Sequence, residues 1–164
     1  VNDTCESSVP GVYAVGDVNG GPQFTYVSLD DFRIVFGALT GNSQYTLKDR
    51  KNIPYTTFLT PPLSRVGLTE EDAINQGYTV KTKEMLVATM PRAHVNDYLK
   101  GAFKIVVDAD NDLILGATLY SQGAEELINL IKMAMDNNIP YTYFKNQIFT
   151  HPTMAENLND LCNF

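Results

Sequence analysis

Two strand-like runs separated by an acidic turn restrict the possible folds more than any other part of the sequence. Residues 102–109 and 113–120 are rich in β-branched and other apolar side chains, and Asp110, Asn111 and Asp112 stand between them. Asp and Asn tolerate the backbone geometry of tight turns, so this pattern is typical of a β-hairpin. An isolated hairpin is at best marginally stable in water, so further strands or helices must cover its apolar face.

The segments around this hairpin supply the other elements of a sheet domain. Thr69 and Gly77 are typical start and stop residues of a short helix, and Thr153 with Glu156 fits the capping box that opens a helix. Further strands are predicted over residues 55–60, 66–68 and 78–89, and further helices over residues 124–137, 143–148 and 153–161. Strands in the middle with helices on either side indicate an α+β fold with a largely antiparallel sheet flanked by helices.

The N-terminal segment has a different pattern. A short apolar run at residues 11–17 is typical of a fully buried strand, and a helix is predicted over residues 23–39. The face of this helix that is expected to be buried carries Phe32, Val35, Phe36 and Leu39. The chain begins with Val1 instead of Met and its first strand has no sheet neighbours nearby. We therefore expect this segment to be a remnant of a domain that lies mostly upstream.

A polar stretch separates this segment from the rest of the chain. Residues 40–54 are punctuated by Gly, Asn and Pro, as is typical of a linker. The sequence therefore predicts two domains, a remnant at residues 1–45 and a complete domain at residues 46–164.

The composition excludes several classes of protein. Of the 164 residues, 12 are Lys or Arg and 19 are Asp or Glu, and the formal net charge of −7 has the wrong sign for binding the phosphates of nucleic acid. No apolar run reaches the roughly 20 residues of a membrane-spanning helix, and the N-terminus lacks the pattern of a signal peptide. We therefore expect a cytoplasmic protein with no nucleic-acid or membrane partner.

Few side chains are suited to catalysis or metal binding. Cys5 and Cys162 lie at opposite ends of the sequence and match neither a redox pair nor a metal motif. His94 and His151 are the only histidines, and no glycine-rich phosphate loop is present. We expect His94 to be an exposed loop residue and expect no metal site. A site built from the two histidines and carboxylates remains the alternative.

His151 is the first candidate for acid/base chemistry. Pro152 biases it toward an extended backbone directly before a helix, and Glu156 follows closely enough for its carboxylate to reach the imidazole. Such a pair would fix the imidazole tautomer and favour the imidazolium. The alternative is that Glu156 only completes the capping box with Thr153. The two roles are compatible, because a carboxylate has two oxygens.

Asp17 is the second candidate. It follows Gly16 at the end of the expected strand, where open α/β sheets place their ligand contacts. The alternative is a turn residue that caps the following helix, and the spacing alone does not choose between the two.

Three segments resemble motifs of the pyridine nucleotide-disulfide oxidoreductases, the family of glutathione reductase, dihydrolipoamide dehydrogenase and mercuric reductase. Residues 9–18 (VPGVYAVGDV) resemble its second flavin-binding motif, and residues 62–73 (PLSRVGLTEEDA) resemble the opening of its C-terminal dimerisation domain. Residues 148–156 (IFTHPTMAE) are similar to its terminal His-Pro-Thr motif. The three motifs occur in the order of the family and span essentially the whole chain.

Three further segments resemble one branch of this family. Residues 24–35, 49–52 and 91–93 are most similar to the bacterial branch linked to resistance against reactive chlorine species. Members of that branch are described as reducing hypothiocyanous acid or copper(II).

The resemblance implies a role for each candidate residue. In the family NAD(P)H reduces FAD, the flavin reduces a Cys-x4-Cys disulfide, and the resulting dithiol attacks the substrate. By resemblance, Asp17 with Gly16 would bind the flavin, His151 would be the acid/base for the disulfide of the other subunit, and Glu156 would orient His151. Asn157 stands where many relatives have a second Glu, a departure that leaves the dyad intact.

The same resemblance makes residues 1–45 the C-terminal remnant of a FAD-binding domain and residues 46–164 a dimerisation domain. It implies a homodimer with FAD, NAD(P)H and a small-molecule or disulfide-type oxidant as substrate in the full-length enzyme. The fragment alone is expected to hold no cofactor and to be inactive. The alternatives are a free-standing dimeric interaction module without catalysis, or a small metal-binding protein.

Overall fold

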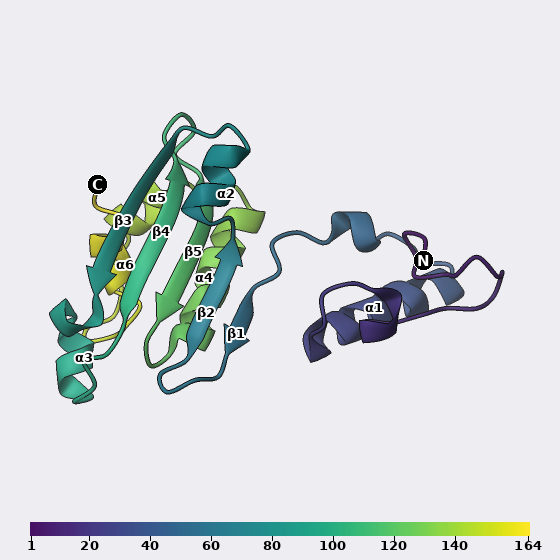
Figure 1. Cartoon of the computed structure of the whole chain (residues 1–164), viewed down its shortest axis with the longest axis horizontal. Coiled ribbons are helices and arrows are strands. Elements are labelled where there is room, and N and C mark those ends of the chain that lie inside the picture. The colour runs from purple at the N-terminus through teal and green to yellow at the C-terminus, as the bar shows by residue number, and fades with distance from the viewer. The chain divides into compact units, whose positions relative to one another are not determined.

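The computed structural model describes residues 1–164 and divides the chain into two compact units, Val1–Lys51 and Asn52–Phe164 (Figure 1). The division lies within the polar stretch and a few residues beyond residue 45, the expected end of the first domain. The first unit extends this far because Arg50 forms ion pairs with two neighbouring aspartates of the helix in that unit.

The first unit consists of one helix, α1 (Thr25–Leu39), and two short 3-10 helices, η1 (Gly16–Asn19) and η2 (Leu47–Asp49). The prediction of a buried strand at residues 11–17 is wrong. This run has one isolated bridge, at Tyr13, and its valines are exposed. A strand is stable only beside other strands, and this unit provides none.

Helix α1 forms as predicted, but a different face of it is buried. Phe32, Phe36 and Leu39 are 54%, 57% and 66% exposed, so the expectation that they are buried is wrong. The buried stripe carries Val27, Asp31 and Ile34. The helix has apolar residues on two sides, and hydrogen bonds to the Asp31 carboxylate select the side that packs inside this unit.

The second unit is an antiparallel sheet of five strands in the order β1–β2–β5–β4–β3 (Figure 1). These strands are β1 (Tyr55–Thr57), β2 (Leu63–Gly67), β3 (Val80–Leu86), β4 (Ala102–Asp108) and β5 (Ile114–Tyr120). The predicted hairpin is β4–β5, with Phe103 opposite Leu119, and Asp112 adopts a positive φ of 59° in its turn. The prediction of an α+β fold with an antiparallel sheet is confirmed.

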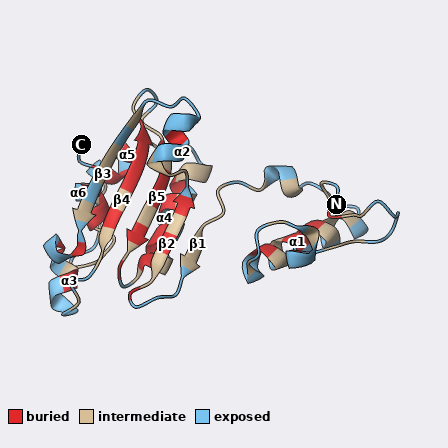
Figure 2. Cartoon of the chain, in the orientation of Figure 1, coloured by how far each residue is buried: buried red, intermediate tan, exposed pale blue.

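Three helices cover one face of this sheet (Figure 1). Helix α4 (Ala124–Asp136) packs across β5 and β2, and α6 (Asn157–Leu161) packs on β3 and β4. Helix α5 (Tyr141–Asn146) packs against α6. Buried residues are concentrated in the neighbouring strands β5 and β4 and on the inner side of α4 (Figure 2).

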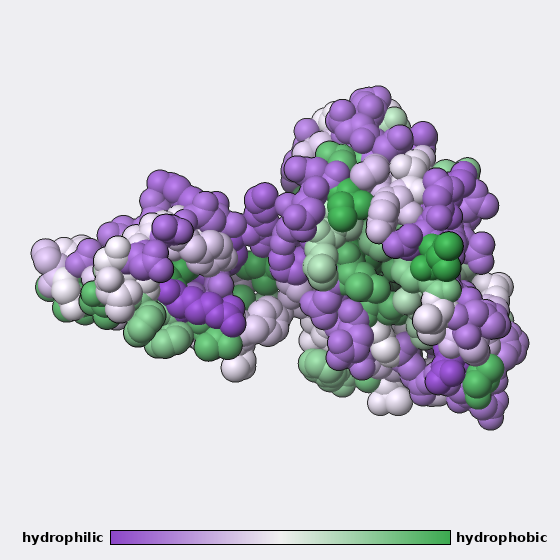
Figure 3. Space-filling model, turned by 180° about the vertical axis from the view of Figure 1, so that it is seen from behind, coloured by the Kyte–Doolittle hydropathy of each residue, from purple (hydrophilic) through white to green (hydrophobic).

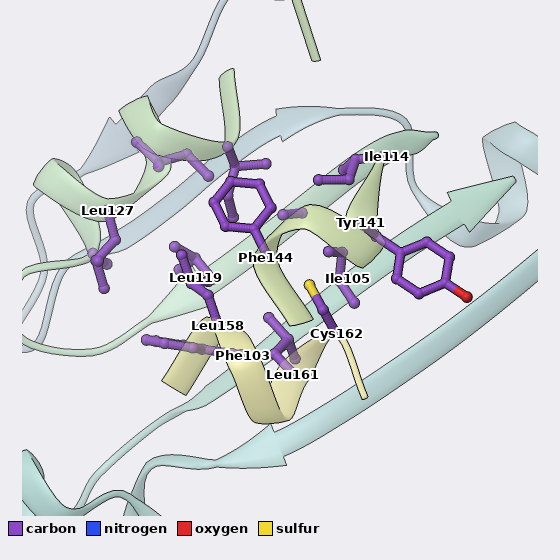
Figure 4. Packing of buried hydrophobic residues seen from close by; sticks show 14 of the residues in the cluster. Phe103, Ile105, Ile114, Leu119, Leu127, Tyr141, Phe144, Leu158, Leu161 and Cys162 are labelled. Carbon is purple, nitrogen blue, oxygen red and sulfur yellow. The ribbon is translucent and has the colours of Figure 1, made fainter. Parts of the chain in front are cut away.

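The core lies between the sheet and these helices. Phe103 and Leu119 from the sheet are fully buried, and they lie close to Leu158 and Leu161 of α6 (Figure 4). Full burial of a side chain of this size stabilises the fold by about 1.5–3 kcal/mol. This packing fixes α6 against the sheet, and with it the residues directly before α6.

Two short helices lie outside this layer. Helix α2 (Glu70–Asn75) begins after Thr69, the predicted start residue, and Thr69 exchanges capping hydrogen bonds with Asp72. The segment around His94, which is predicted to be a loop, instead forms α3 (Pro91–Val95), because proline is preorganised for the first position of a helix. None of the helices in the chain has both the length and the apolar character needed to cross a membrane.

Candidate functional site

His151 lies on the loop that joins α5 to α6. Asn159 of α6 holds the start of this loop, because its amide donates hydrogen bonds to the carbonyls of Phe144 and Gln147 at 2.6 and 2.9 Å. The core packing of α6 holds the end of the loop. His151 is therefore presented on a fixed support, with 68% of its side chain exposed.

His151 and Glu156 come together, which is one of the two alternatives that their spacing left open. The Nδ1 atom of His151 lies 2.7 Å from Oε2 of Glu156. Because an ionised carboxylate only accepts hydrogen bonds, Nδ1 carries the proton and donates it. The other ring nitrogen, Nε2, has no hydrogen-bond partner within the chain. In the neutral imidazole this nitrogen carries the lone pair, so it can accept a proton.

Thr153 binds the second oxygen of the Glu156 carboxylate. Oε1 of Glu156 accepts a hydrogen bond from the N–H of Thr153 at 2.9 Å, and the N–H of Glu156 donates to Oγ1 of Thr153 at 3.2 Å. These are the reciprocal bonds of the predicted capping box. The helix itself starts later than expected, at Asn157, because the chain bends at Met154 and turns at Ala155 and Glu156. The capping box and the His151–Glu156 pair form together, since each carboxylate oxygen of Glu156 has its own partner.

Glu156 is the less exposed member of the pair, with 18% of its side chain accessible. The hydrogen bond from His151 holds the pKa of Glu156 below its ordinary value of 4.5, and the N–H of Thr153 adds to this effect. Partial burial acts in the opposite direction but does not prevail. Glu156 is therefore ionised at neutral pH, and it can both orient the imidazole and stabilise the imidazolium that forms when Nε2 takes up a proton.

Gly16 and Asp17 lie in η1 of the first unit, in a 3-10 turn instead of the expected strand end. Gly16 has a φ of +72°, and a Cβ at this position would lie 2.6 Å from Oγ of Ser28, so only glycine fits. Its N–H donates to Oδ2 of Asp31 at 2.7 Å. The side chain of Asp17 is exposed and has no hydrogen-bond partner in the chain. Its carboxylate is therefore available to an external hydrogen-bond donor.

Asp31 is a residue that the sequence analysis missed. Its side chain is completely buried, and besides Gly16 it accepts hydrogen bonds from Nδ2 of Asn19 at 2.8 Å and from the guanidinium of Arg50. These donors offset the cost of burying a carboxylate. Asp31 thereby holds residues on both sides of Asp17. No local pattern pointed to it, because Asn19 and Arg50 lie 12 and 19 positions away along the chain.

The remaining candidates stand apart from the dyad. His94 is exposed as predicted, but it lies on α3, with Nε2 2.8 Å from the carbonyl oxygen of Ala88. The chain brings together no group of three or more His, Cys, Asp or Glu side chains that could hold a metal ion. Cys5 and Cys162 are free and buried, and burial raises the pKa of both thiols, that of Cys162 to about 12. Neither thiol is poised to act as a thiolate.

The helix-covered side of the second unit carries exposed apolar residues. Figure 3 views the molecule from behind and shows hydrophobic groups gathered near the centre of this unit. The exposed apolar side chains on α4, on α5 and on the loop before His151 are Leu130, Met133, Tyr143 and Ile148. Exposed apolar side chains gathered on one side of a domain are typical of a contact surface for another protein.

Comparison with known proteins shows the family. The family described as pyridine nucleotide-disulphide oxidoreductase, dimerisation domain, matches residues 53–162. The probable pyridine nucleotide-disulfide oxidoreductase RclA of Escherichia coli K12 is 47% identical over 161 residues, which cover 98% of this chain and 36% of that protein. A mercuric reductase of Lysinibacillus sphaericus is 35% identical, over 96% of this chain and 29% of that protein.

The solved structures agree with this result. The Cu(II) complex of the HOCl-induced flavoprotein disulfide reductase RclA from Escherichia coli matches with a TM-score of 0.95 and 46% identity, over 99% of this chain and 37% of that chain. The chain thus spans well under half the length of the relatives it matches. By sequence and by fold, it belongs to the pyridine nucleotide-disulfide oxidoreductase family and carries the dimerisation domain of that family.

Proposed function

We propose that this chain is the C-terminal part of a FAD- and NAD(P)H-dependent disulfide oxidoreductase. In this proposal His151 and Glu156 are the acid/base dyad for a redox disulfide of the partner subunit in a homodimer. The observation that carries the proposal is the 2.7 Å hydrogen bond between Nδ1 and Oε2, which leaves Nε2 without a partner in the chain. The family match and the names of the relatives, RclA and mercuric reductase, support the redox part of the proposal.

The dyad is suited to move one proton at Nε2. A thiol attacks a disulfide or another oxidant only as the thiolate. Neutral His151 takes the thiol proton at Nε2 while its Nδ1–H remains bonded to Glu156, and the carboxylate stabilises the imidazolium that results. The same nitrogen returns the proton when a thiolate leaves. Glu156 stays ionised throughout and sets the direction of the ring.

The disulfide that the dyad serves lies outside this chain, because both cysteines of the chain are buried and free. His151 is largely exposed, and the apolar side chains of Tyr143 and Ile148 lie shortly before it in the sequence. A second subunit that covers this apolar surface would bring its own disulfide to the imidazole. The match to a dimerisation domain supports this arrangement.

The first unit fits a flavin cofactor through Asp17. We assign residues 1–45 to the end of a FAD-binding domain, and the unpaired carboxylate of Asp17 fits a hydroxyl-bearing group such as the ribityl chain. Asp31 holds the turn that presents this carboxylate, through the N–H of Gly16. When bound, FAD supplies the transfer of an electron pair from NAD(P)H to the disulfide.

The first unit also carries apolar surface that it cannot bury itself. The stripe of α1 formed by Phe32, Phe36 and Leu39 is open within this unit. This exposure supports packing against the remainder of a FAD-binding domain. The fragment by itself is accordingly expected to retain no flavin and to oxidise no NAD(P)H.

We infer that the substrate is a small-molecule or disulfide-type oxidant in the cytoplasm. The relative with the TM-score of 0.95 is described as HOCl-induced and as a Cu(II) complex, which supports an oxidant of this kind or copper(II).

Replacement of His151 tests the acid/base role. In the full-length enzyme, His151→Ala should slow reoxidation of the reduced enzyme by its oxidant about 10²–10⁴-fold, while NAD(P)H still reduces the flavin at the normal rate. Stopped-flow absorbance of the flavin separates the two half-reactions. His94→Ala is the matched control, because it removes the other histidine of the chain. Equal reoxidation rates in the His151 variant and the wild type would refute the proposed role.

Mixed dimers test whether the dyad acts across the subunit interface. One variant lacks His151 and the other lacks one redox cysteine, and each alone should be inactive. If the site is shared between subunits, random mixing of the two should restore roughly a quarter of the wild-type activity, because half of the dimers then hold one intact site of two. Mixed dimers that stay inactive would show that His151 acts within its own subunit.

A further inference from the structure

We propose that Asn157 is a positioning residue that keeps the His151–Glu156 dyad in its working geometry, a role that rests on the function proposed above. Asn157 is the first residue of α6 and is only 2% exposed. A buried side-chain amide needs partners for its hydrogens inside the protein, because water cannot reach them. The hydrogen-bond acceptors of the Asn157 amide lie in the turn that carries the dyad.

The amide of Asn157 binds the turn that leads from His151 into α6. Its Nδ2 atom lies 3.1 Å from the carbonyl oxygen of Thr153 and 3.1 Å from that of Met154. An NH₂ group has two hydrogens, so it can donate one to each carbonyl. The turn is thus closed by a side chain that belongs to the helix after it.

Thr153 links Asn157 to Glu156 through hydrogen bonds of its own backbone and side chain. While its carbonyl is held by Asn157, its N–H donates to Oε1 of Glu156 at 2.9 Å. Its hydroxyl donates to the carbonyl of Thr150 at 2.8 Å and accepts from the N–H of Glu156 at 3.2 Å. The backbone on both sides of Thr153 therefore has one orientation. That orientation sets the plane of the Glu156 carboxylate, whose Oε2 binds His151.

Asn157 also connects the dyad to the core. The next residue, Leu158, and Leu161 on the same helix are buried beneath the sheet. The amide therefore links a rigid, packed helix to an exposed turn. Without it, the turn would be held at its end by fewer bonds, and the imidazole would sample more orientations.

The tautomer of His151 reports the geometry directly. In the dyad Nδ1 must carry the hydrogen, because its partner is a carboxylate. In His94 the hydrogen must be on Nε2, because its partner is the carbonyl oxygen of Ala88 at 2.8 Å. The two histidines of the chain should thus be opposite tautomers in their neutral forms. The ¹⁵N chemical shifts of the two rings distinguish these tautomers in one sample.

The variant Asn157→Leu removes both donors while it keeps the size and burial of the side chain. At a pH where the rings are neutral, we expect His151 in this variant to shift from Nδ1–H toward a mixture with Nε2–H, while His94 keeps its spectrum. Leu161→Val is the control, because it weakens the packing of the same helix and leaves the amide in place. It should lower the Tm without changing the tautomer of His151.

A second variant tests the positioning role of Asn157 if Asn157→Leu does not fold. In Asn157→Ser the hydroxyl can donate to the carbonyl four residues earlier, which is that of Thr153, but not to both carbonyls. An intermediate shift of the His151 tautomer is expected. A wild-type spectrum in the Ser variant and in any folded Leu variant would overturn the proposal, as would an equal shift in Leu161→Val.

Kinetics of the full-length enzyme connects this role to the reaction. Asn157→Leu should slow the reoxidation step about 10-fold and leave flavin reduction by NAD(P)H unchanged. The function proposed for His151 and the positioning role of Asn157 are contradicted by different results. If His151→Ala has no kinetic effect, the proposed function is wrong, whereas an unchanged tautomer in the Asn157 variants contradicts only the positioning role.

Discussion

The Oε2 atom of Glu156 lies 2.7 Å from Nδ1 of His151, while Oε1 of the same carboxylate is held by a backbone N–H. One side chain thus completes a capping box and orients a surface imidazole. The capping contact has already reduced the rotamer freedom of Glu156, so pairing with His151 costs less conformational entropy than it would for a free surface carboxylate. This smaller loss of conformational entropy explains how a largely exposed histidine can have a defined orientation.

The stability contribution of Glu156 should depend on pH. In the folded chain the hydrogen bonds from His151 and Thr153 lower the pKa of Glu156 below 4.5. A carboxyl group with a lowered pKa stabilises the fold above its unfolded pKa, and this stabilisation is lost as the pH falls through the folded value. Wild type should therefore have a higher Tm than Glu156→Gln at pH 7, and the difference should shrink as the pH falls below 4.5 and through the lowered pKa of the folded chain. Circular dichroism melts across this range provide the measurement, and a constant difference would contradict the expectation.

Both cysteines should be unreactive in the native chain. Cys5 and Cys162 are fully buried, and burial raises the pKa of Cys162 to about 12, so the thiolate is scarce and inaccessible. We expect no reaction with Ellman's reagent at pH 8 in buffer and two reactive thiols per chain in denaturant. Rapid reaction of the native chain would show that one of the thiols is exposed by local opening.

Loss of Arg50 should destabilise the first unit. The variant Arg50→Met leaves the fully buried Asp31 carboxylate without its cationic partner, at a cost of about 3 kcal/mol in the free energy of unfolding. Amide hydrogen exchange of α1, read residue by residue, measures this local loss. The double variant Asp31→Asn with Arg50→Met should recover part of the stability, because no buried charge remains unpaired. If the double variant loses as much free energy of unfolding as Arg50→Met and Asp31→Asn lose together when measured singly, this explanation is contradicted.

Gly101 should tolerate no side chain. It has a φ of +124°, and a Cβ there would collide with the carbonyl oxygen of Tyr120 in the neighbouring strand. Gly101→Ala should destabilise the second unit by about 3 kcal/mol, from backbone strain and overpacking together. Gly77→Ala is the matched control, since its φ is +88° but nothing lies within 4 Å of the added Cβ. It should cost only about 1 kcal/mol in urea denaturation. Equal effects of the two substitutions would exclude the collision as the cause.

Most of the sheet domain could be predicted from the sequence because its signals are local. The β4–β5 hairpin is encoded by two apolar runs and the turn at Asp112, and α2 is encoded by the capping pair of Thr69 and Asp72. The spacing of His151 and Glu156 allowed their contact but did not choose it over a capping role for Glu156 alone. In each case the deciding residues lie within a few positions of one another, so steric and hydrogen-bonding preferences act before the chain has folded.

The first unit was harder to predict for the opposite reason. The valines near Tyr13 have the composition of a buried strand, but strand formation depends on neighbours that this unit does not contain. Phe32 and Phe36 have helical spacing, but the spacing does not say which of two apolar sides will be covered.

The sequence by itself determined the antiparallel sheet and its flanking helices, because these follow from periodicity and turn chemistry. Spacing left open whether Glu156 only caps the helix or also pairs with His151, and the tertiary structure shows both contacts. Only the tertiary structure decided that Asp31 is buried against Arg50 and that the amide of Asn157 closes the turn beneath the dyad. Burial of a polar side chain depends on donors and acceptors brought together from separate segments, and a linear pattern does not carry that information.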